Sequence, residues 1–327
     1  MHVPDGILSG PVLLASAALS ALAVGTSASR SRGRMGSRAV AMLGVTGAFV
    51  FAAQMLNFPV AGGTSGHLVG GVLAAVLLGP SAAVVVMSAV LVLQCLAFGD
   101  VGLLALGANA LNMAVIHPVV GYATYIAIAR RGARGGSTHR GVQIAGAAFG
   151  AWVATIASAW VCSGELVLSR VGGPSVVLFA MTSVHGVVGL GEGLVTALVL
   201  GALLRVRPDL SYGAASATSP AGVASAALLG FATSMALALF VSPFACTWPD
   251  GLERLTSRVG FDPSRARIFV APMNGYSLHA IPTFGLSAAI AAFLGTLAVF
   301  GSCCALGWWL SPRRRPETPN AAVSAEL

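Results

Sequence analysis

The stretch GPSAAVVVMSAVLVLQCLAF, residues 79–98, contains no charged residue. A run of about 20 apolar residues is the length that a helix needs to cross the hydrocarbon core of a membrane. The same bias extends over the whole chain, in which 56% of the 327 residues are hydrophobic and 9% are charged. A soluble domain carries about 25% charged residues, and a membrane barrel would alternate apolar with polar residues. We therefore expect an all-α fold, a polytopic membrane helix bundle.

The apolar segments are about nine in number, which predicts a bundle of seven helices followed by a two-helix hairpin. The third and fourth segments are separated at Gly79-Pro80, because proline ends one helix and suits the start of the next. The third is too short to span a membrane alone, so we expect it to be tilted or partly re-entrant. The segments cover residues 11–26, 38–58, 67–79, 80–98, 104–130, 141–163, 176–204, 220–242 and 285–310.

The arginines predict the orientation of these segments. All 18 basic residues are arginine, and short cytoplasmic loops are enriched in basic residues. With the N-terminus outside and the C-terminus in the cytoplasm, the outer side holds only Arg170 and the four arginines of one long loop, residues 243–284. We predict a multi-pass protein of the inner (plasma) membrane, in contact with lipid. The net charge of +8 then reflects membrane orientation, and we expect no nucleic-acid partner.

The chain divides into two membrane units. We predict one unit over residues 1–207, a polar linker over 208–219, a two-span hairpin with its external loop over 220–311, and a cytoplasmic tail over 312–327. Four of the five cysteines lie in apolar segments, and we interpret them as small core residues. The role of the adjacent pair Cys303-Cys304 is left open.

The N-terminus carries the most specific chemistry. No basic region precedes the first apolar stretch, so we expect no signal peptide and a retained N-terminus. The amine of Met1, the backbone nitrogen of His2 and the His2 imidazole can close adjacent chelate rings on one metal ion. Nitrogen donors in a plane suit Ni(II) or Cu(II). Such a site lacks one donor in the plane.

His67 is the candidate for that fourth donor. It opens the third segment, and two preceding spans return the chain to the side of the membrane on which the N-terminus lies. The alternative is that His2 follows the initiator methionine by chance and has no function, and that His67 is an ordinary polar residue at a helix end.

Four stretches of sequence together carry a family resemblance. They are MHVPDGILS (1–9), GTSGHLVGG (63–71), FGD with LGANALNM (98–100 and 106–113), and HG with GEGLVT (185–186 and 191–196). They resemble signatures of the NikM/CbiM family, the substrate-binding (S) components of energy-coupling-factor nickel and cobalt transporters. Val101 departs from the family, which more often has glycine there.

The C-terminal hairpin is similar to a second component of the same systems. SPFA (242–245) and PDGLE (249–253) resemble the NikN/CbiN-like small subunit, so the chain looks like a fusion of the two. The resemblance implies a transport protein and not an enzyme, with no cofactor and with Ni²⁺ or Co²⁺ as the transported ion. It also implies that Met1, His2 and His67 bind the metal. The partners would be an energy-coupling transmembrane subunit and cytoplasmic ATPase subunits, since this chain has no phosphate-binding loop.

Other polar residues in apolar segments are candidates for a supporting shell. His185 and Glu192 are two helical turns apart and project from one face, and buried ionisable groups in membrane helices are usually functional. They stand near the metal or form a structural pair between helices. Asn109 and Asn112 can orient His67 or bond between helices, and the second role is favoured.

Two other functions remain open. An intramembrane redox protein would use His117 and His185 as axial haem ligands and would show a Soret band. A secondary metal transporter would use the same metal site but transport without an ATPase. The choice between nickel and cobalt, the subunit stoichiometry, and whether the loop 243–284 contacts the metal are also open.

Overall fold

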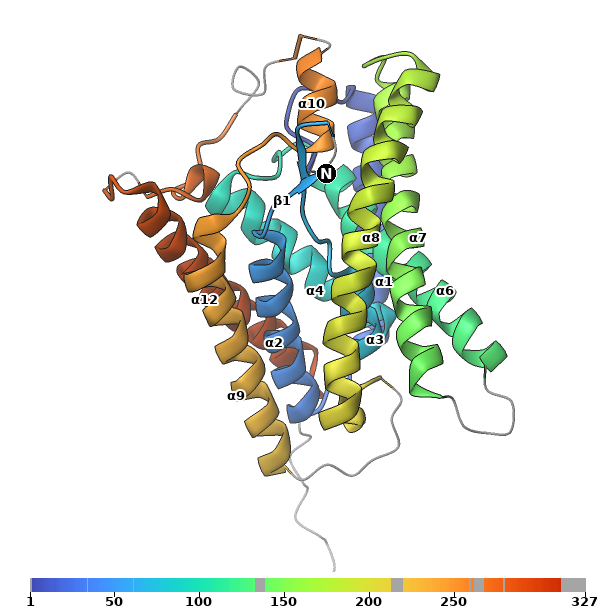
Figure 1. Cartoon of the computed structure of the whole chain (residues 1–327), viewed down its shortest axis with the longest axis vertical. Helices are drawn as coiled ribbons and strands as arrows, with labels where there is room; N and C mark the ends of the chain where they lie inside the picture. Colours follow the sequence, from blue (N-terminus) through green and yellow to red (C-terminus); the bar gives the residue numbers. More distant parts are fainter. Residues whose placement is uncertain are drawn as a thin grey trace, which may run out of the picture.

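The computed structural model describes residues 2–33, 35–60, 62–132, 139–212, 220–258, 260–261, 268–278 and 280–312. Within these residues, eight helices are long and apolar enough to cross a membrane. They stand side by side as one bundle (Figure 1), which confirms the all-α, polytopic fold. The spans are Gly10–Ser31, Ser37–Gln54, Pro80–Phe98, Leu106–Gly132, Arg140–Leu168, Pro174–Val206, Gly222–Phe244 and Gly285–Leu310.

The regular helices within these spans are interrupted in places by π-helical turns. Proline stands in the first turn of α1, α4 and α8, where its missing N–H costs no hydrogen bond. The helices are α1 (Gly10–Ser31), α2 (Ser37–Gln54), α4 (Pro80–Leu93), α5 (Leu106–Asn109), α6 (His117–Gly132), α7 (Arg140–Leu168), α8 (Pro174–Val206), α9 (Pro220–Ala236) and α12 (Phe284–Leu310).

The third of the nine predicted segments is not among these spans, in agreement with the prediction that it is too short to cross a membrane alone. Helix α3 (Gly71–Leu78) has only 8 residues, and residues 67–70 before it are not helical. Gly70 and Gly79 flank α3 with φ of 78° and 83°, in the region that favours glycine.

The third segment still connects the two ends of the bundle. His67 stacks on His2 at one end, whereas Gly79 packs against the ring of Tyr212 at the other. Pro80 has no N–H to donate to the carbonyl of Val76, and the N–H of Tyr212 donates to that oxygen at 3.0 Å instead. The same far end joins α1 to α12, because the N–H of Gly33 donates to the carbonyl of Leu310 at 2.8 Å.

A small β-hairpin covers the end of the bundle at which the N-terminus lies (Figure 1). Strands β1 (Phe58–Val60) and β2 (Thr64–Gly66) are antiparallel, with Phe58 opposite Gly66. We did not predict this hairpin. Helix α10 (Gly251–Arg258) lies at the same end of the molecule and comes from the loop between α9 and α12.

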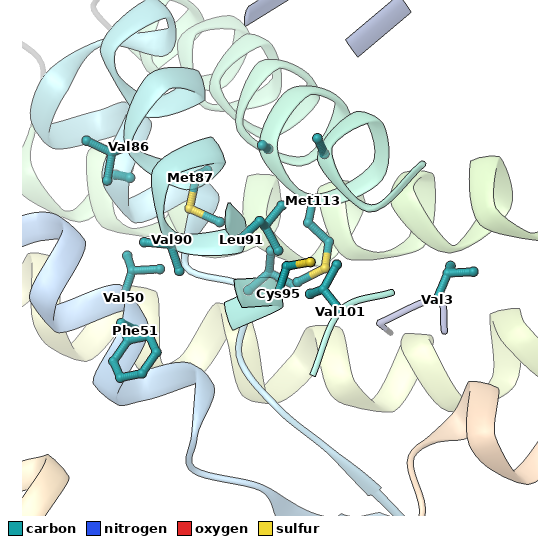
Figure 2. Packing of buried hydrophobic residues seen from close by; sticks show 14 of the residues in the cluster. Val3, Val50, Phe51, Val86, Met87, Val90, Leu91, Cys95, Val101 and Met113 are labelled. Carbon is teal, nitrogen blue, oxygen red and sulfur yellow. The ribbon is translucent and has the colours of Figure 1, made fainter. Parts of the chain in front are cut away.

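The hydrophobic core reaches the N-terminal segment. Val3 is 0% exposed and belongs to the same buried cluster as Leu91 and Met113 (Figure 2). Val3 therefore lies inside the bundle end and not on its surface, which limits where His2 can lie.

The C-terminal hairpin packs on α2 and on the core. A Cβ on Gly295 of α12 would stand 2.5 Å from both Phe51 and Phe98, so this glycine allows close contact with two buried rings. Further along α12, Cys303 is 0% exposed and faces Gly47 of α2. This agrees with a packing role for that cysteine.

This contact gives a test of the interface between α12 and the core. Replacing Gly295 with valine should force the two rings aside and destabilise the protein by about 1–3 kcal/mol. The measurement is thermal unfolding of the detergent-purified chain. Gly301→Val is the matched control, because nothing lies within 4 Å of a Cβ on that α12 glycine. Equal losses in the two variants would show that Gly295 has no special packing role.

Candidate metal centre

Buried side chains clamp the N-terminal segment. The N–H of Val3 donates to Asn109 Oδ1 at 2.7 Å, and Asn109 Nδ2 donates back to the Val3 carbonyl at 2.9 Å. The Asp5 carboxylate accepts the N–H groups of Leu103, Leu104 and Ala105 at 2.8–3.2 Å. These bonds satisfy backbone groups of Val3 and of residues 103–105, and they hold the segment that carries His2. Asn109 thus fixes the N-terminus and makes no bond to His67.

His2 and His67 meet here, although they are far apart in the chain. Their ring centroids are 4.8 Å apart and their planes differ by 16°. The His2 side chain is 8% exposed and His67 is 7% exposed. Met1, the third predicted ligand, lies outside the described residues. Two of the three predicted metal-site residues are therefore side by side.

Asp100 holds the His2 ring. Its Oδ2 lies 3.0 Å from His2 Nδ1 and accepts a hydrogen bond of 2.8 Å from the Tyr276 hydroxyl. Burial acts to raise the pKa of Asp100, but the neighbouring His2 outweighs it and holds the pKa below the ordinary value. The other His2 ring nitrogen, Nε2, is buried and has no hydrogen-bond partner among the described residues. Asp100 belongs to the FGD motif at residues 98–100. The sequence predicted neither its contact with His2 nor the contact of Tyr276 with Asp100.

His67 is neutral in this setting. Its Nδ1 lies 2.9 Å from the Leu68 carbonyl. Burial, with the charge of His2 as a further cause, lowers the pKa of His67 from 6.5 to about 3. A neutral imidazole is the form that binds metals, and a carbonyl at one ring nitrogen leaves the other to act as ligand. That ligand would be Nε2.

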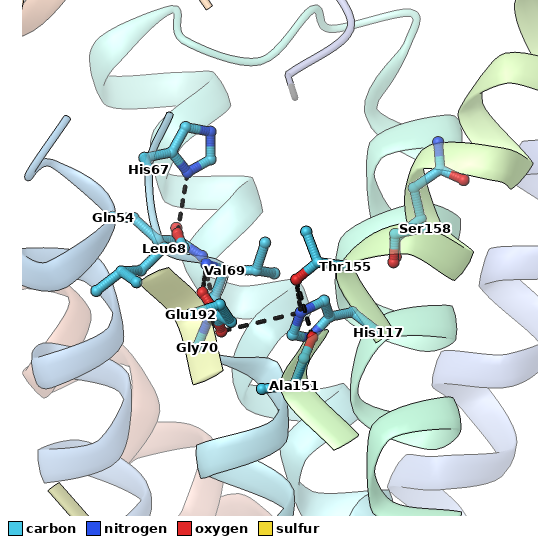
Figure 3. Close-up of polar contacts among 11 residues, drawn as sticks. Gln54, His67, Leu68, Val69, Gly70, His117, Ala151, Thr155, Ser158 and Glu192 are labelled. Carbon is cyan, nitrogen blue, oxygen red and sulfur yellow. Dashed lines mark hydrogen bonds and ion pairs between the residues drawn. The ribbon is translucent and has the colours of Figure 1, made fainter. Parts of the chain in front are cut away.

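Glu192 touches the backbone beside His67 and not its ring. Its two carboxylate oxygens accept the N–H groups of Val69 and Gly70, each at 2.7 Å (Figure 3). On the opposite side, Gln54 Nε2 donates to the Val69 carbonyl at 2.7 Å. The unwound segment after His67 is therefore held by buried side chains.

The other predicted supporting residues have separate partners. His185 Nδ1 lies 2.8 Å from the Met181 carbonyl, so this contact is within its own helix and not with Glu192. Its ring lines a small space of about 10 Å³ together with His67 and Asp250. Asn112 is away from the site, because it donates to Glu165 Oε2 at 2.7 Å and so joins α7. This contact agrees with the favoured role of Asn112, a bond between helices.

The loop of the C-terminal hairpin covers the centre. Asp250 caps α10 by accepting the N–H groups of Leu252 and Glu253, each at 2.8 Å, while Glu253 accepts the N–H of Asp250 at 2.9 Å. This reciprocal pattern is a capping box, so the PDGLE motif has a structural role at the start of α10. The capped end lies against β2, since the N–H of Ser65 donates to the Pro249 carbonyl at 2.9 Å.

A cavity of about 350 Å³ lies between this loop and the histidines. Within the described part of the chain, no three His, Cys, Asp or Glu side chains are placed to hold a metal ion by themselves. The residues lining the cavity that carry metal-binding or acidic groups are His2, His67, Asp100, Cys246, Asp250 and Glu253.

The three remaining histidines are His117, His139 and His279. His139 is exposed just before α7, and His279 lies outside the described residues. His117 is 0% exposed and lies 3.9 Å from Glu192, measured from Nε2 to Oε1.

The low pKa of His67 predicts a pH dependence of stability. Below pH 6.5 the unfolded chain protonates this residue, whereas the folded protein does so only near pH 3. Stability must then fall as pH drops below 6.5, because the unfolded state binds more protons. Between pH 7 and pH 5 we expect His67→Gln to remove about 2 kcal/mol of this loss.

The measurement is denaturant unfolding of the metal-free chain at the two pH values. His139→Gln is the control, since an exposed histidine should leave the pH dependence unchanged. A pH dependence that is the same in His67→Gln and in the unmodified chain would contradict the buried, neutral state of His67.

Comparisons with known proteins agree on one family. Residues 2–210 match the CbiM model, the cobalt uptake substrate-specific transmembrane region, and residues 224–312 match the PDGLE domain. A putative fused nickel transport protein NikMN of Archaeoglobus fulgidus is 33% identical over 313 residues, covering 95% of this chain and 98% of that protein. A fused nickel transport protein NikMN of Rhodobacter capsulatus is 37% identical over 222 residues, covering 64% of this chain and 63% of that one.

A solved structure supports the same assignment. A crystal structure described as a truncated transition metal transporter is 32% identical, has a TM-score of 0.57, and covers 63% of this chain and 99% of that one. The family match extends over more than half of the chain, and the resemblance noted in the sequence is confirmed. This multi-pass membrane protein belongs to the CbiM family and carries a PDGLE domain behind the family region.

Proposed function

We propose that the chain captures Ni²⁺ or Co²⁺ at the N-terminal end of the bundle. The ligands are the Met1 amine, the His2 backbone nitrogen, His2 Nδ1 and His67 Nε2. The observation that carries the proposal is the stacking of His2 on His67, with centroids 4.8 Å apart, at the end of a clamped N-terminal segment. The proposal is supported by the two relatives that are named as fused nickel transport proteins.

The choice of ring nitrogens follows from chelate geometry. A ring closed through the backbone nitrogen of His2 has to use Nδ1, which is bonded to the ring carbon nearest the backbone. That nitrogen faces Asp100 at 3.0 Å, so an arriving metal displaces the carboxylate from Nδ1. Four nitrogens in a plane favour Ni²⁺, and Co²⁺ is accepted by similar donors.

We assign capture to this chain and energy supply to partners. The expected partners are an energy-coupling transmembrane subunit and cytoplasmic ATPase subunits, and the chain itself is not an enzyme. We place the protein in the inner membrane with the N-terminus outside and the C-terminus in the cytoplasm. In this orientation the metal centre, the β-hairpin and α10 face the supply of ions. We retain residues 1–207 as the capture unit and 220–311 as the hairpin that covers it.

The redox alternative fits the packing poorly. His185 lines a space of only about 10 Å³. A Cβ on Gly71 would lie 2.6 Å from His117 Nδ1, so that ring is also tightly enclosed. A haem between these histidines would need both regions to repack.

The chelate model makes a prediction about the N-terminus. Adding residues before Met1 converts the amine into an amide, and His2→Ala removes an imidazole, so each change should abolish tight Ni²⁺ binding. Isothermal titration of the purified chain with a native N-terminus is the measurement, and His139→Ala is the control. Unchanged affinity in the extended chain would rule out the amine as a ligand.

The proposal that partner subunits supply the energy for transport makes a second prediction. A secondary transporter would accumulate ⁶³Ni²⁺ in cells that lack the ATPase subunits, whereas a capture component should not. We expect uptake only when the coupling subunit and the ATPase are produced together with this chain. An inactive ATPase variant serves as the control, and uptake in its presence would favour the secondary transporter.

A further inference from the structure

Glu192 occupies an unusual position for an acidic residue. It lies within the membrane-spanning helix α8 and is 1% exposed. Acidic groups inside a membrane are costly, and those that occur there usually serve a function. Neither the ligand set nor the loop over the cavity gives Glu192 a role.

The contacts of Glu192 are with backbone. One oxygen accepts the N–H of Val69 and the other that of Gly70, both at 2.7 Å. These groups stand at the start of α3, where Gly70 offers no side-chain cap. The N–H groups at a helix start lack partners within the helix and carry partial positive charge. The carboxylate of α8 thus caps α3 from another helix (Figure 3).

The capped segment carries His67. Val69 is two residues from His67, and its carbonyl accepts the bond from Gln54, whose Oε1 in turn accepts a bond of 2.7 Å from Gln94 Nε2. These bonds fix the backbone on both sides. Because four non-helical residues have little rigidity of their own, the direction of the His67 ring depends on these anchors.

The surroundings leave Glu192 little freedom. His117 of α6 lies 3.9 Å away, and the Thr155 hydroxyl of α7 lies 3.4 Å from the same imidazole nitrogen. Gly71 packs directly against His117, with room for no Cβ. A close-packed arrangement of this kind transmits displacement.

We propose that Glu192 is a positioning residue for the metal centre: it holds the Val69-Gly70 backbone and so directs His67 at the ion. Because Glu192 belongs to α8, a shift of α8 relative to α3 moves His67 and weakens its bond to the metal. Movement of α8 is thus a route by which the partners can release the ion. The inference rests on the proposed function, since it assigns a role in metal binding.

Glu165 provides a matched control. It is also a buried acid in a membrane-spanning helix, 5% exposed in α7. It accepts two hydrogen bonds of 2.7 Å, but from the side chains of Ser16 and Asn112. Loss of its charge should affect packing between helices without moving His67.

The test compares Glu192→Gln with Glu165→Gln in the full-length chain. The glutamine at 192 offers one oxygen to two N–H groups, so one of them loses its partner. Altered partners behind a metal ligand typically weaken affinity by about 10–100-fold, and we expect that loss of Ni²⁺ affinity in Glu192→Gln only. The visible absorption of bound Ni²⁺ should also move to longer wavelength, because a nitrogen donor is lost or misaligned. Equal weakening in both variants, or no change in either, would overturn the proposal.

Hydrogen exchange on the metal-free chain tests the positioning separately. Exchange of the amides at residues 67–70 should accelerate in Glu192→Gln and stay unchanged in Glu165→Gln. Glu192→Asp keeps the charge but draws the carboxylate back by one carbon, so its exchange rate at these amides should be intermediate. This variant replaces Glu192→Gln if that one fails to fold. Unchanged exchange in the 192 variants would refute the positioning role. If exchange changes as expected but the unmodified chain binds no Ni²⁺, the proposed function fails and the anchoring of this segment stands.

Discussion

An extended segment inside an apolar bundle is stable only when its backbone N–H and C=O groups find partners within the protein. Two segments of this chain obey that constraint at the same place. Asn109 pairs the backbone of Val3, and Asp5 ties the same segment to the N–H groups of residues 103–105. The residues after His67 are paired by Glu192 and Gln54. Each set of bonds directs one imidazole, and the two imidazoles meet. The candidate centre follows from the way in which irregular backbone is accommodated.

The C-terminal hairpin adds a cover to this centre. The capping box of Asp250 and Glu253 begins α10 directly against strand β2, and Tyr276 reaches Asp100 beside His2. These contacts place two parts of the loop, the PDGLE turn and the segment around Tyr276, over the cavity. A hairpin that contacts both strand β2 and Asp100, the partner of His2, is suited to control access to the cavity.

Much of the architecture was predictable from the sequence because hydrophobicity is a local property. Apolar runs located the spanning helices, and the break at Gly79-Pro80 separated α3 from α4. The length of α3 was harder to predict, because Gly70 and Gly71 continue an apolar pattern whether or not they are helical. The β-hairpin was missed since its strands have 3 residues each, too few to show a period.

The centre was predictable in part for a similar reason. His2 has a local signature in its nearness to the N-terminus, and topology alone placed His67 on the same side. The contacts of Tyr276 with Asp100 and of Glu192 with Val69 span 176 and 123 positions, and no spacing rule connects them. Glu192 was noticed as a buried acid, but its backbone partners have no side-chain pattern to reveal them.

The central claim is that main-chain and imidazole nitrogens hold the ion together. X-ray absorption at the nickel edge, on the Ni²⁺-loaded chain with its native N-terminus, tests this most directly. The account predicts a planar site with nitrogen donors only, including the outer-shell scattering of two imidazoles. A six-coordinate site rich in oxygen, or a shell of sulfur, would contradict it.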